Sequence, residues 1–214
     1  MRALRWSAAV VAIGVLGGCA PAPYRAKVVD LSTACADSWS RLKPSRPGPD
    51  QPEAPSEEFA EHSTCVGPPA LPARTSVMLY DLAGVTRPAQ LAVSLPVSEG
   101  GTLAGAVDVL DAGFRPLKHH GFGEFTRRGG AYTLAVFLRD GSPRYLAVSP
   151  DAAFVGHEVK TIGTLSQVTP ISTGYVSVVV VKGQEVKRTY PLMAGGKISV
   201  TIVSSSQPAQ AVAP

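Results

Sequence analysis

The chain has 214 residues, of which 45% are hydrophobic and 17% are charged, and its formal net charge is +4. This length suits one domain with loose ends, and the apolar fraction is enough for a buried core. The small net charge excludes the strongly basic class of nucleic-acid-binding domains. No apolar run reaches the roughly 20 residues that a membrane-spanning helix needs.

The first 18 residues have the pattern of a secretory signal peptide. Arg2 and Arg5 precede an apolar run, and two glycines follow it. Residues 16–19, Leu-Gly-Gly-Cys, resemble the lipobox of bacterial lipoproteins, in which the cysteine is acylated and becomes the first residue of the mature chain. The alternative is a plain signal peptide that is cut after Ala20, which would discard Cys19.

The lipobox resemblance implies where the protein works. Acyl chains on Cys19, palmitate among them, would hold the protein at a membrane, and stable anchoring needs more than one chain. Ala20 stands where lipoproteins retained in the inner membrane of enteric bacteria carry aspartate. We therefore expect an outer-membrane lipoprotein that faces the periplasm. Residues 19–30 would be an extended tether, because Pro21 and Pro23 disfavour helix.

Cys35 and Cys65 remain as a pair if Cys19 carries lipid. An even pair of cysteines in an oxidising compartment predicts a disulfide. Such a bond would close a loop of about 30 residues and stabilise the fold by roughly 3.5 kcal/mol in the chain-entropy model. The alternative is two free, buried thiols. We expect no metal site and no cofactor, because no histidine or further cysteine lies at ligand spacing from either residue.

Residues 31–74 are expected to hold a short helix and a proline-rich loop that the disulfide fastens at both ends. Apolar residues at spacings of three and four predict the helix within residues 31–42. Trp39 in this segment is interpreted as a packing residue near the disulfide rather than a ligand platform. Residues 43–58 contain five prolines and four acidic residues, which is typical of a mobile loop.

Residues 75–203 consist of short apolar runs separated by turn residues, a pattern that predicts an all-β domain. The clearest strands are 90–95 and 131–139, where apolar residues alternate and Phe137 falls on the face opposite its apolar neighbours. The other expected strands are residues 76–82, 103–110, 114–118, 145–148, 157–165, 175–181, 185–190 and 197–203.

Two dipeptides predict how these strands connect. Asp140-Gly141 indicates a hairpin between the runs on either side, and Lys182-Gly183 indicates a turn that makes the last three runs a meander. About nine or ten strands at this spacing favour an antiparallel β-sandwich, jelly-roll or immunoglobulin-like, with a short N-terminal helix and disordered ends. A closed barrel is the alternative. Residues 204–214, rich in Ser, Ala, Gln and Pro, are expected to be a disordered tail.

Residues 107–117 resemble the maltose-operon periplasmic protein family, which has an apolar strand ending in Leu-Asp, a turn, and then an apolar residue and proline. The resemblance covers residues 35–159. The acidic proline-rich segment, Cys65 and the strand-like C-terminal part depart from the family. The resemblance implies a periplasmic β-domain that is accessory to saccharide uptake (carbohydrate transport) or to the envelope, and it transfers no catalytic residue.

A local basic cluster is the main candidate site on the domain surface. It would meet lipid headgroups, lipopolysaccharide phosphates or an acidic partner; the alternative is scattered surface charge. Adjacent histidines on a strand point to opposite faces and do not easily chelate one ion. The six residues of the cluster are Arg115, Lys118, His119, His120, Arg127 and Arg128.

The sequence contains neither a G-x-S-x-G nucleophile elbow nor a P-loop. Asp108 and Asp111 could be paired acids for glycoside hydrolysis, although their spacing favours a role in the turn. Tyr132, Tyr145 and Tyr175 could stack on sugars, but alternation assigns most of them to the core. We therefore expect a non-enzymatic lipoprotein that binds an envelope protein or a saccharide. The alternatives are a structural subunit of an envelope complex and a small envelope hydrolase.

Overall fold

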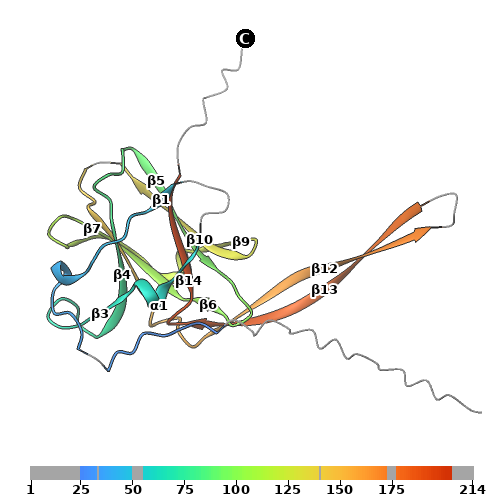
Figure 1. The fold of residues 1–214 in the computed structure, drawn as a ribbon, viewed down its shortest axis with the longest axis horizontal. Coiled ribbons are helices and arrows are strands. Elements are labelled where there is room, and N and C mark those ends of the chain that lie inside the picture. The colour runs from blue at the N-terminus through green and yellow to red at the C-terminus, as the bar shows by residue number, and fades with distance from the viewer. Residues whose placement is uncertain (1–24, 33, 50–54, 140, 173–176, 204–214) are drawn as a thin grey trace, which may run out of the picture.

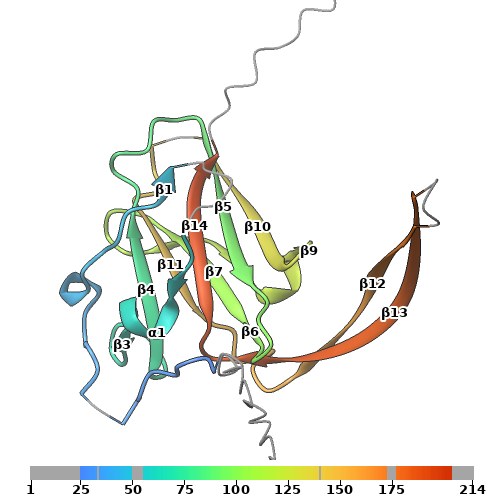
Figure 2. The same cartoon turned by 45° about the vertical axis from the view of Figure 1, so that its right-hand side comes forward.

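The computed structural model describes residues 25–32, 34–49, 55–139, 141–172 and 177–203, and Cys19 and the tail 204–214 lie outside them. Two sheets pack face to face as a β-sandwich, and a long hairpin projects from it (Figures 1 and 2). The all-β sandwich that the sequence predicts is confirmed. No helix in the described ranges is long and apolar enough to cross a membrane.

The first sheet has the strand order β1-β14-β5-β10-β9, and β2 also pairs with β14. All of its pairings are antiparallel except that of β1 with β14. Its strands are β1 (Gly48–Pro49), β2 (Glu57–Glu58), β5 (Ala89–Pro96), β9 (Thr126–Arg128), β10 (Ala131–Leu138) and β14 (Lys197–Val203).

The second sheet is antiparallel throughout, with the order β3-β4-β11-β7-β8. Its strands are β3 (Thr64–Val66), β4 (Thr75–Asp81), β7 (Gly105–Leu110), β8 (Pro116–His120) and β11 (Tyr145–Pro150).

The core lies between the two sheets and follows the alternation that the sequence predicts. On β5, Leu91, Val93 and Leu95 are fully buried. On β10 the inward residues are buried, whereas Phe137 on the opposite face is 67% exposed. Successive side chains of a strand point to opposite faces, so one apolar face per strand is enough to build this core. Its other members include Met78, Tyr80, Val107, Val109, Leu146, Val148, Ile198 and Val200.

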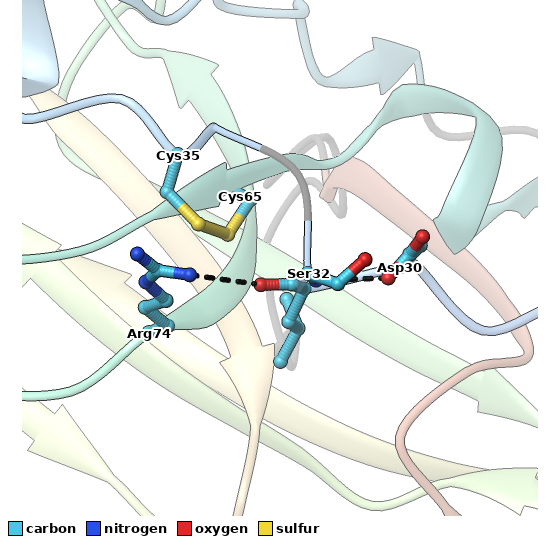
Figure 3. Close-up of a disulfide and its surroundings, with 6 residues drawn as sticks. Asp30, Ser32, Cys35, Cys65 and Arg74 are labelled. Carbon is cyan, nitrogen blue, oxygen red and sulfur yellow. Dashed lines mark hydrogen bonds between the residues drawn. A yellow bond between two sulfur atoms is a disulfide. The ribbon is translucent and has the colours of Figure 1, made fainter.

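A second, smaller cluster covers the outer face of the second sheet, where Leu42 packs on β4 and β11 residues. The disulfide between Cys35 and Cys65, which the sequence predicts, joins this N-terminal segment to β3 (Figure 3). Beside it, the Arg74 guanidinium donates to the carbonyl of Leu31 at 3.4 Å. β4 is therefore buried on both faces.

The helix predicted within residues 31–42 is wrong. Only a three-residue 3-10 turn, η1 (Trp39–Arg41), forms there. The backbone before this turn is hydrogen-bonded to β3 and the residue after it. The Ala36 N–H donates to the Cys65 carbonyl at 2.8 Å, and the Ala36 carbonyl accepts from the Gly67 N–H at 3.0 Å. The described α-helix of this region is α1 (Phe59–His62), which follows β2.

The described parts of the proline-rich segment are paired rather than loose. Ser45 bridges Tyr80 of β4, and β1 and β2 both pair with β14. Residues 50–54 lie outside the described ranges. The segment therefore runs along one side of the sandwich from the second sheet to the first.

Both predicted connections are also wrong. β10 and β11 belong to different sheets, so the chain around Gly141 crosses from one sheet to the other and forms no hairpin. β13 (Ser177–Met193) runs through Lys182-Gly183 without a turn, and all of β12 (Glu158–Ser172) pairs with it. Turn propensity depends on a few adjacent residues, whereas strand pairing depends on residues that are distant in the chain. At both places the strand pairing, and not the local turn propensity, determines the structure.

The hairpin of β12 and β13, called the arm below, is fixed to the body at its base. β6 (Thr102–Leu103) pairs in parallel with Leu192 and Met193. The Leu192 side chain is buried in the core. From this base the two strands leave the sandwich together (Figures 1 and 2).

Candidate functional site

The fold divides the predicted basic cluster. Arg115, Lys118 and the two histidines lie on or beside β8 in the second sheet, whereas Arg127 and Arg128 lie on β9 in the first. His120 is 4% exposed, so its assignment to a surface patch is wrong. Its register opposite Val107 places it on the face of β8 that looks into the sandwich. The other five residues are exposed.

The two adjacent histidines face opposite ways, as the strand geometry predicts. His119 is on the outside, with Nδ1 2.7 Å from Oδ1 of Asp108 on β7. His120 lies inside, with Nδ1 2.7 Å from Oε2 of Glu124. The carboxylate accepts, so His120 donates from Nδ1. This hydrogen bond is the main reason why the pKa of Glu124 is lowered.

The carboxylates considered for glycoside hydrolysis have structural partners. Asp111 serves the turn before β8, as the sequence favours, because its Oδ1 accepts from the N–H groups of Gly113 and Arg115 at 2.8 and 2.9 Å. Asp108 does not serve that turn and instead pairs with His119 across the strands. Within the described ranges, no group of three or more His, Cys, Asp or Glu residues is placed to hold a metal ion.

The tyrosines considered as sugar platforms have neighbouring rings against them. Tyr145 stacks on Phe114 with ring centroids 4.6 Å apart, and Phe114 stacks on Trp39 at 6.0 Å. Trp39 is therefore a packing residue, as the sequence favours. Tyr132 lies against Phe122 at 5.0 Å. Tyr175 lies outside the described residues.

The base of the arm is a polar and aromatic junction between the arm and the body. The N–H of Gly156 donates to the Leu192 carbonyl, and the N–H of Leu192 donates to the His157 carbonyl, both at 2.8 Å. The Arg127 guanidinium lies 5.9 Å from the ring centre of Tyr190 on β13 and 6.0 Å from that of Tyr132 on β10. One cation on β9 thus contacts the arm and the first sheet together.

Beyond this base the arm has no other strand partner in the described part of the chain. β12 has 15 residues, which at roughly 3.3 Å per residue gives the arm a length of about 50 Å. A two-stranded ribbon on its own is at best marginally stable in water, and both of its outer edges carry unpaired N–H and C=O groups. The arm is therefore the candidate functional element.

The sequence contains a signal for the arm that the turn-based interpretation missed. Residues 161–181 include no charged residue, and Lys160 and Lys182 flank them. Four consecutive valines, residues 178–181, fall in this stretch. The register pairs Val168 with Val181 and Ile171 with Val178. An uncharged, β-branched stretch of this length is too long for one sandwich strand and fits a two-stranded ribbon.

No protein-family model, no curated protein and no solved structure matches this chain significantly.

Proposed function

We propose that this chain is a non-enzymatic lipoprotein of the outer membrane that faces the periplasm and binds another envelope protein through the arm. The observation that carries the proposal is a ribbon of about 50 Å that leaves the body with both edges unpaired in the described structure. Strand edges of this kind bind a partner by adding its strand to their own.

The composition of the arm supports a protein partner. Long, flat and uncharged strand edges are aggregation sites, and proteins protect them with charge, proline or a covering element. Between Lys160 and Lys182 the arm has no charged residue, and its one proline there is Pro170 on β12. A partner that covers this stretch would remove the hazard, and it would give the arm the burial that a lone ribbon lacks.

The place where the N-terminal tether meets the body supports a position of the arm's base near the membrane. Lys27 lies against the loop that links β13 to β14, because a Cβ on Gly195 would meet the carbonyl group of Lys27. Its ammonium pairs with Glu61, and this bond raises the pKa of Lys27. Cys19 and Arg25 are six residue steps apart, which span at most about 22 Å. A lipid on Cys19 would therefore hold the base of the arm close to the membrane.

An accessory role in saccharide uptake or envelope assembly, which the sequence resemblance implies, is compatible with such a binding protein. The test is photo-crosslinking in bacterial cells that produce the full-length chain. A photoreactive residue replaces Thr164 or Val179 on the arm, and Glu99, exposed on the body, is the matched control position.

We expect one discrete protein adduct at both arm positions and none at Glu99. A second variant replaces residues 163–186 with Asn-Gly, which keeps Ile162 opposite Lys187 and closes the ribbon with a two-residue turn. This variant should unfold as cooperatively as the wild type. Identical adducts at arm and body positions, or none at the arm, would contradict the proposal.

A further inference from the structure

A second surface lies between the two sheets, on the side bordered by β8 and β10. A groove of about 350 Å³ opens there. Val109, Leu117 and Lys118 line it from the second sheet, and Val136, Phe137 and Arg139 line it from the first sheet and its end. Val109 and Val136 are also core residues, 4% and 2% exposed, so the floor of the groove is continuous with the hydrophobic core.

The strand edge on the β10 side of the groove is unpaired. β9 covers β10 only from Ala131 to Thr133, so the outer edge of residues 134–138 has no strand partner within the described ranges. These residues, Leu-Ala-Val-Phe-Leu, contain neither a charge nor a proline. β8, by contrast, carries Pro116 and Lys118, which are residues that protect an edge. The edge of β10 is therefore the one that can accept a strand.

Exposed apolar side chains gather at this groove. Among residues whose exposure the structure describes, the exposed large hydrophobics are Val28, Leu31, Leu117 and Phe137. The first two belong to the N-terminal segment, and the other two line the groove at 48% and 67% exposure. The register slips between Val109 and Leu110, so Leu117 has no opposite residue on β7. A bulge of this kind redirects a side chain.

The groove also has positive charge, and none of its described lining residues is acidic. Lys118 and Arg139 lie on its two walls, and neither has an ion pair in the described part of the chain. The nearby carboxylates of Asp108, Asp111 and Asp81 are bound by His119, by the turn before β8 and by Arg144. The Glu124 carboxylate accepts a hydrogen bond from His120, which is the main cause of its lowered pKa, and the charge of Lys118 also helps to lower that pKa. A ligand for this groove would therefore be apolar and acidic.

We propose that the groove binds an extended acidic segment of a partner protein, which adds as a strand to residues 134–138 of β10. Alternate apolar side chains of this segment would lie on the floor, over Val109 and Val136. Its carboxylates would pair with Lys118 and Arg139. This surface is distinct from the arm and does not depend on it.

Other occupants fit less well. A second copy of the groove would bring Lys118 and Arg139 against the same two cations, which is unfavourable. The described acidic residues of the chain's own proline-rich segment, Glu57 and Glu58, lie on β2 beside β14, opposite Ile198 and Lys197. The same end of β14 lies near Lys27 and the tether, whereas Phe137 lies opposite Gln90, which pairs with Val203 at the other end. The groove is thus at the end away from the proposed lipid anchor.

The test selects random 12-residue peptides, displayed on phage, on the purified full-length protein in detergent. We expect the selected peptides to be acidic, with apolar residues at alternate positions. Their binding should fall at least tenfold in Phe137→Glu and in the Lys118→Glu, Arg139→Glu double variant. Arg128→Glu makes the same kind of charge change on exposed β9, outside the groove, and should leave binding unchanged.

Hydrogen exchange supplies a second measurement. A bound peptide should protect backbone amides within residues 134–138, because strand addition pairs that edge. The proposal is overturned if the selected peptides are basic, if Arg128→Glu weakens binding as much as the groove variants, or if residues 134–138 gain no protection. Dimerisation of the protein that Phe137→Glu abolishes would also overturn it, in favour of a second copy.

Discussion

The two long sides of the sandwich are built differently. On one side the N-terminal segment closes the gap between the sheets: Ser45 and β3 pair with β4, β1 and β2 pair with β14, and the disulfide fastens the segment. On the other side, β8 and β10 leave a groove between them. The chain thus covers the strand edges on one side, whereas on the other side residues 134–138 of β10 have no strand partner within the described ranges, which is the basis of the strand addition proposed above.

The sharpest test of this contrast compares two phenylalanines. Phe59 of α1, on the closed side, is fully buried in the core, whereas Phe137 on the open side is 67% exposed. Phe59→Ala should lower the free energy of unfolding by about 3–5 kcal/mol. Phe137→Ala should change it by less than about 0.5 kcal/mol. Urea unfolding measures the free energy of unfolding of both variants. Equal losses of stability would contradict the difference between the closed and the open side.

The disulfide should be the next largest contributor on the closed side. Replacing both Cys35 and Cys65 with serine should destabilise the protein by about 2–4 kcal/mol, because the bond restricts the unfolded chain. Limited proteolysis should then cut within residues 43–58 faster than in the wild type. Adding reductant should destabilise the wild type and leave the double variant unaffected. A wild type that is insensitive to reductant would argue against the bond.

The turn before β8 should matter less. Asp111 accepts two backbone hydrogen bonds in an exposed turn, so Asp111→Ala should destabilise the protein by about 1 kcal/mol. Asp111→Asn keeps an acceptor oxygen and should recover most of that loss. Thermal unfolding measures both. If the asparagine and alanine variants are equally unstable, the hydrogen bonds are not the reason for the effect.

The smallest effect is expected at Glu124, whose pKa is lowered from its ordinary value of 4.5 chiefly by the hydrogen bond from His120. A carboxyl with a lowered pKa in the folded state adds stability above its unfolded pKa and loses it as the pH falls through the folded value. Because the Glu124 side chain is 53% exposed, Glu124→Gln should destabilise by less than about 1 kcal/mol at pH 7.

This difference between Glu124→Gln and the wild type should vanish in acid, below the lowered pKa. Unfolding curves of both proteins from pH 7 to pH 3 would show it. A difference that grows in acid would have the wrong sign for this pairing. The Asp111→Ala variant provides a comparison, because its loss of stability comes from the two backbone hydrogen bonds of the turn before β8 and not from the His120–Glu124 pair.

The sequence by itself determined the local features of this protein. The alternation on β5 and β10 predicts which faces point inward and places Phe137 on the outer face, as the structure shows. The count of cysteines predicts the Cys35–Cys65 bond, and the strand period predicts that the adjacent histidines face opposite ways. These features follow from the two-residue period of a strand, or from a simple count, and need no knowledge of the partner strands.

Only the tertiary structure decided which strands pair. In the structure the chain around Gly141 crosses from one sheet to the other, and β13 continues through Lys182-Gly183. Ala36 is hydrogen-bonded to β3 and is not part of a helix. It also buried His120, and it left the arm and the edge of β10 without partners in the described ranges. Strand pairing joins residues that are far apart in the chain, so no local pattern encodes it, and both proposed binding surfaces arise from edges left unpaired.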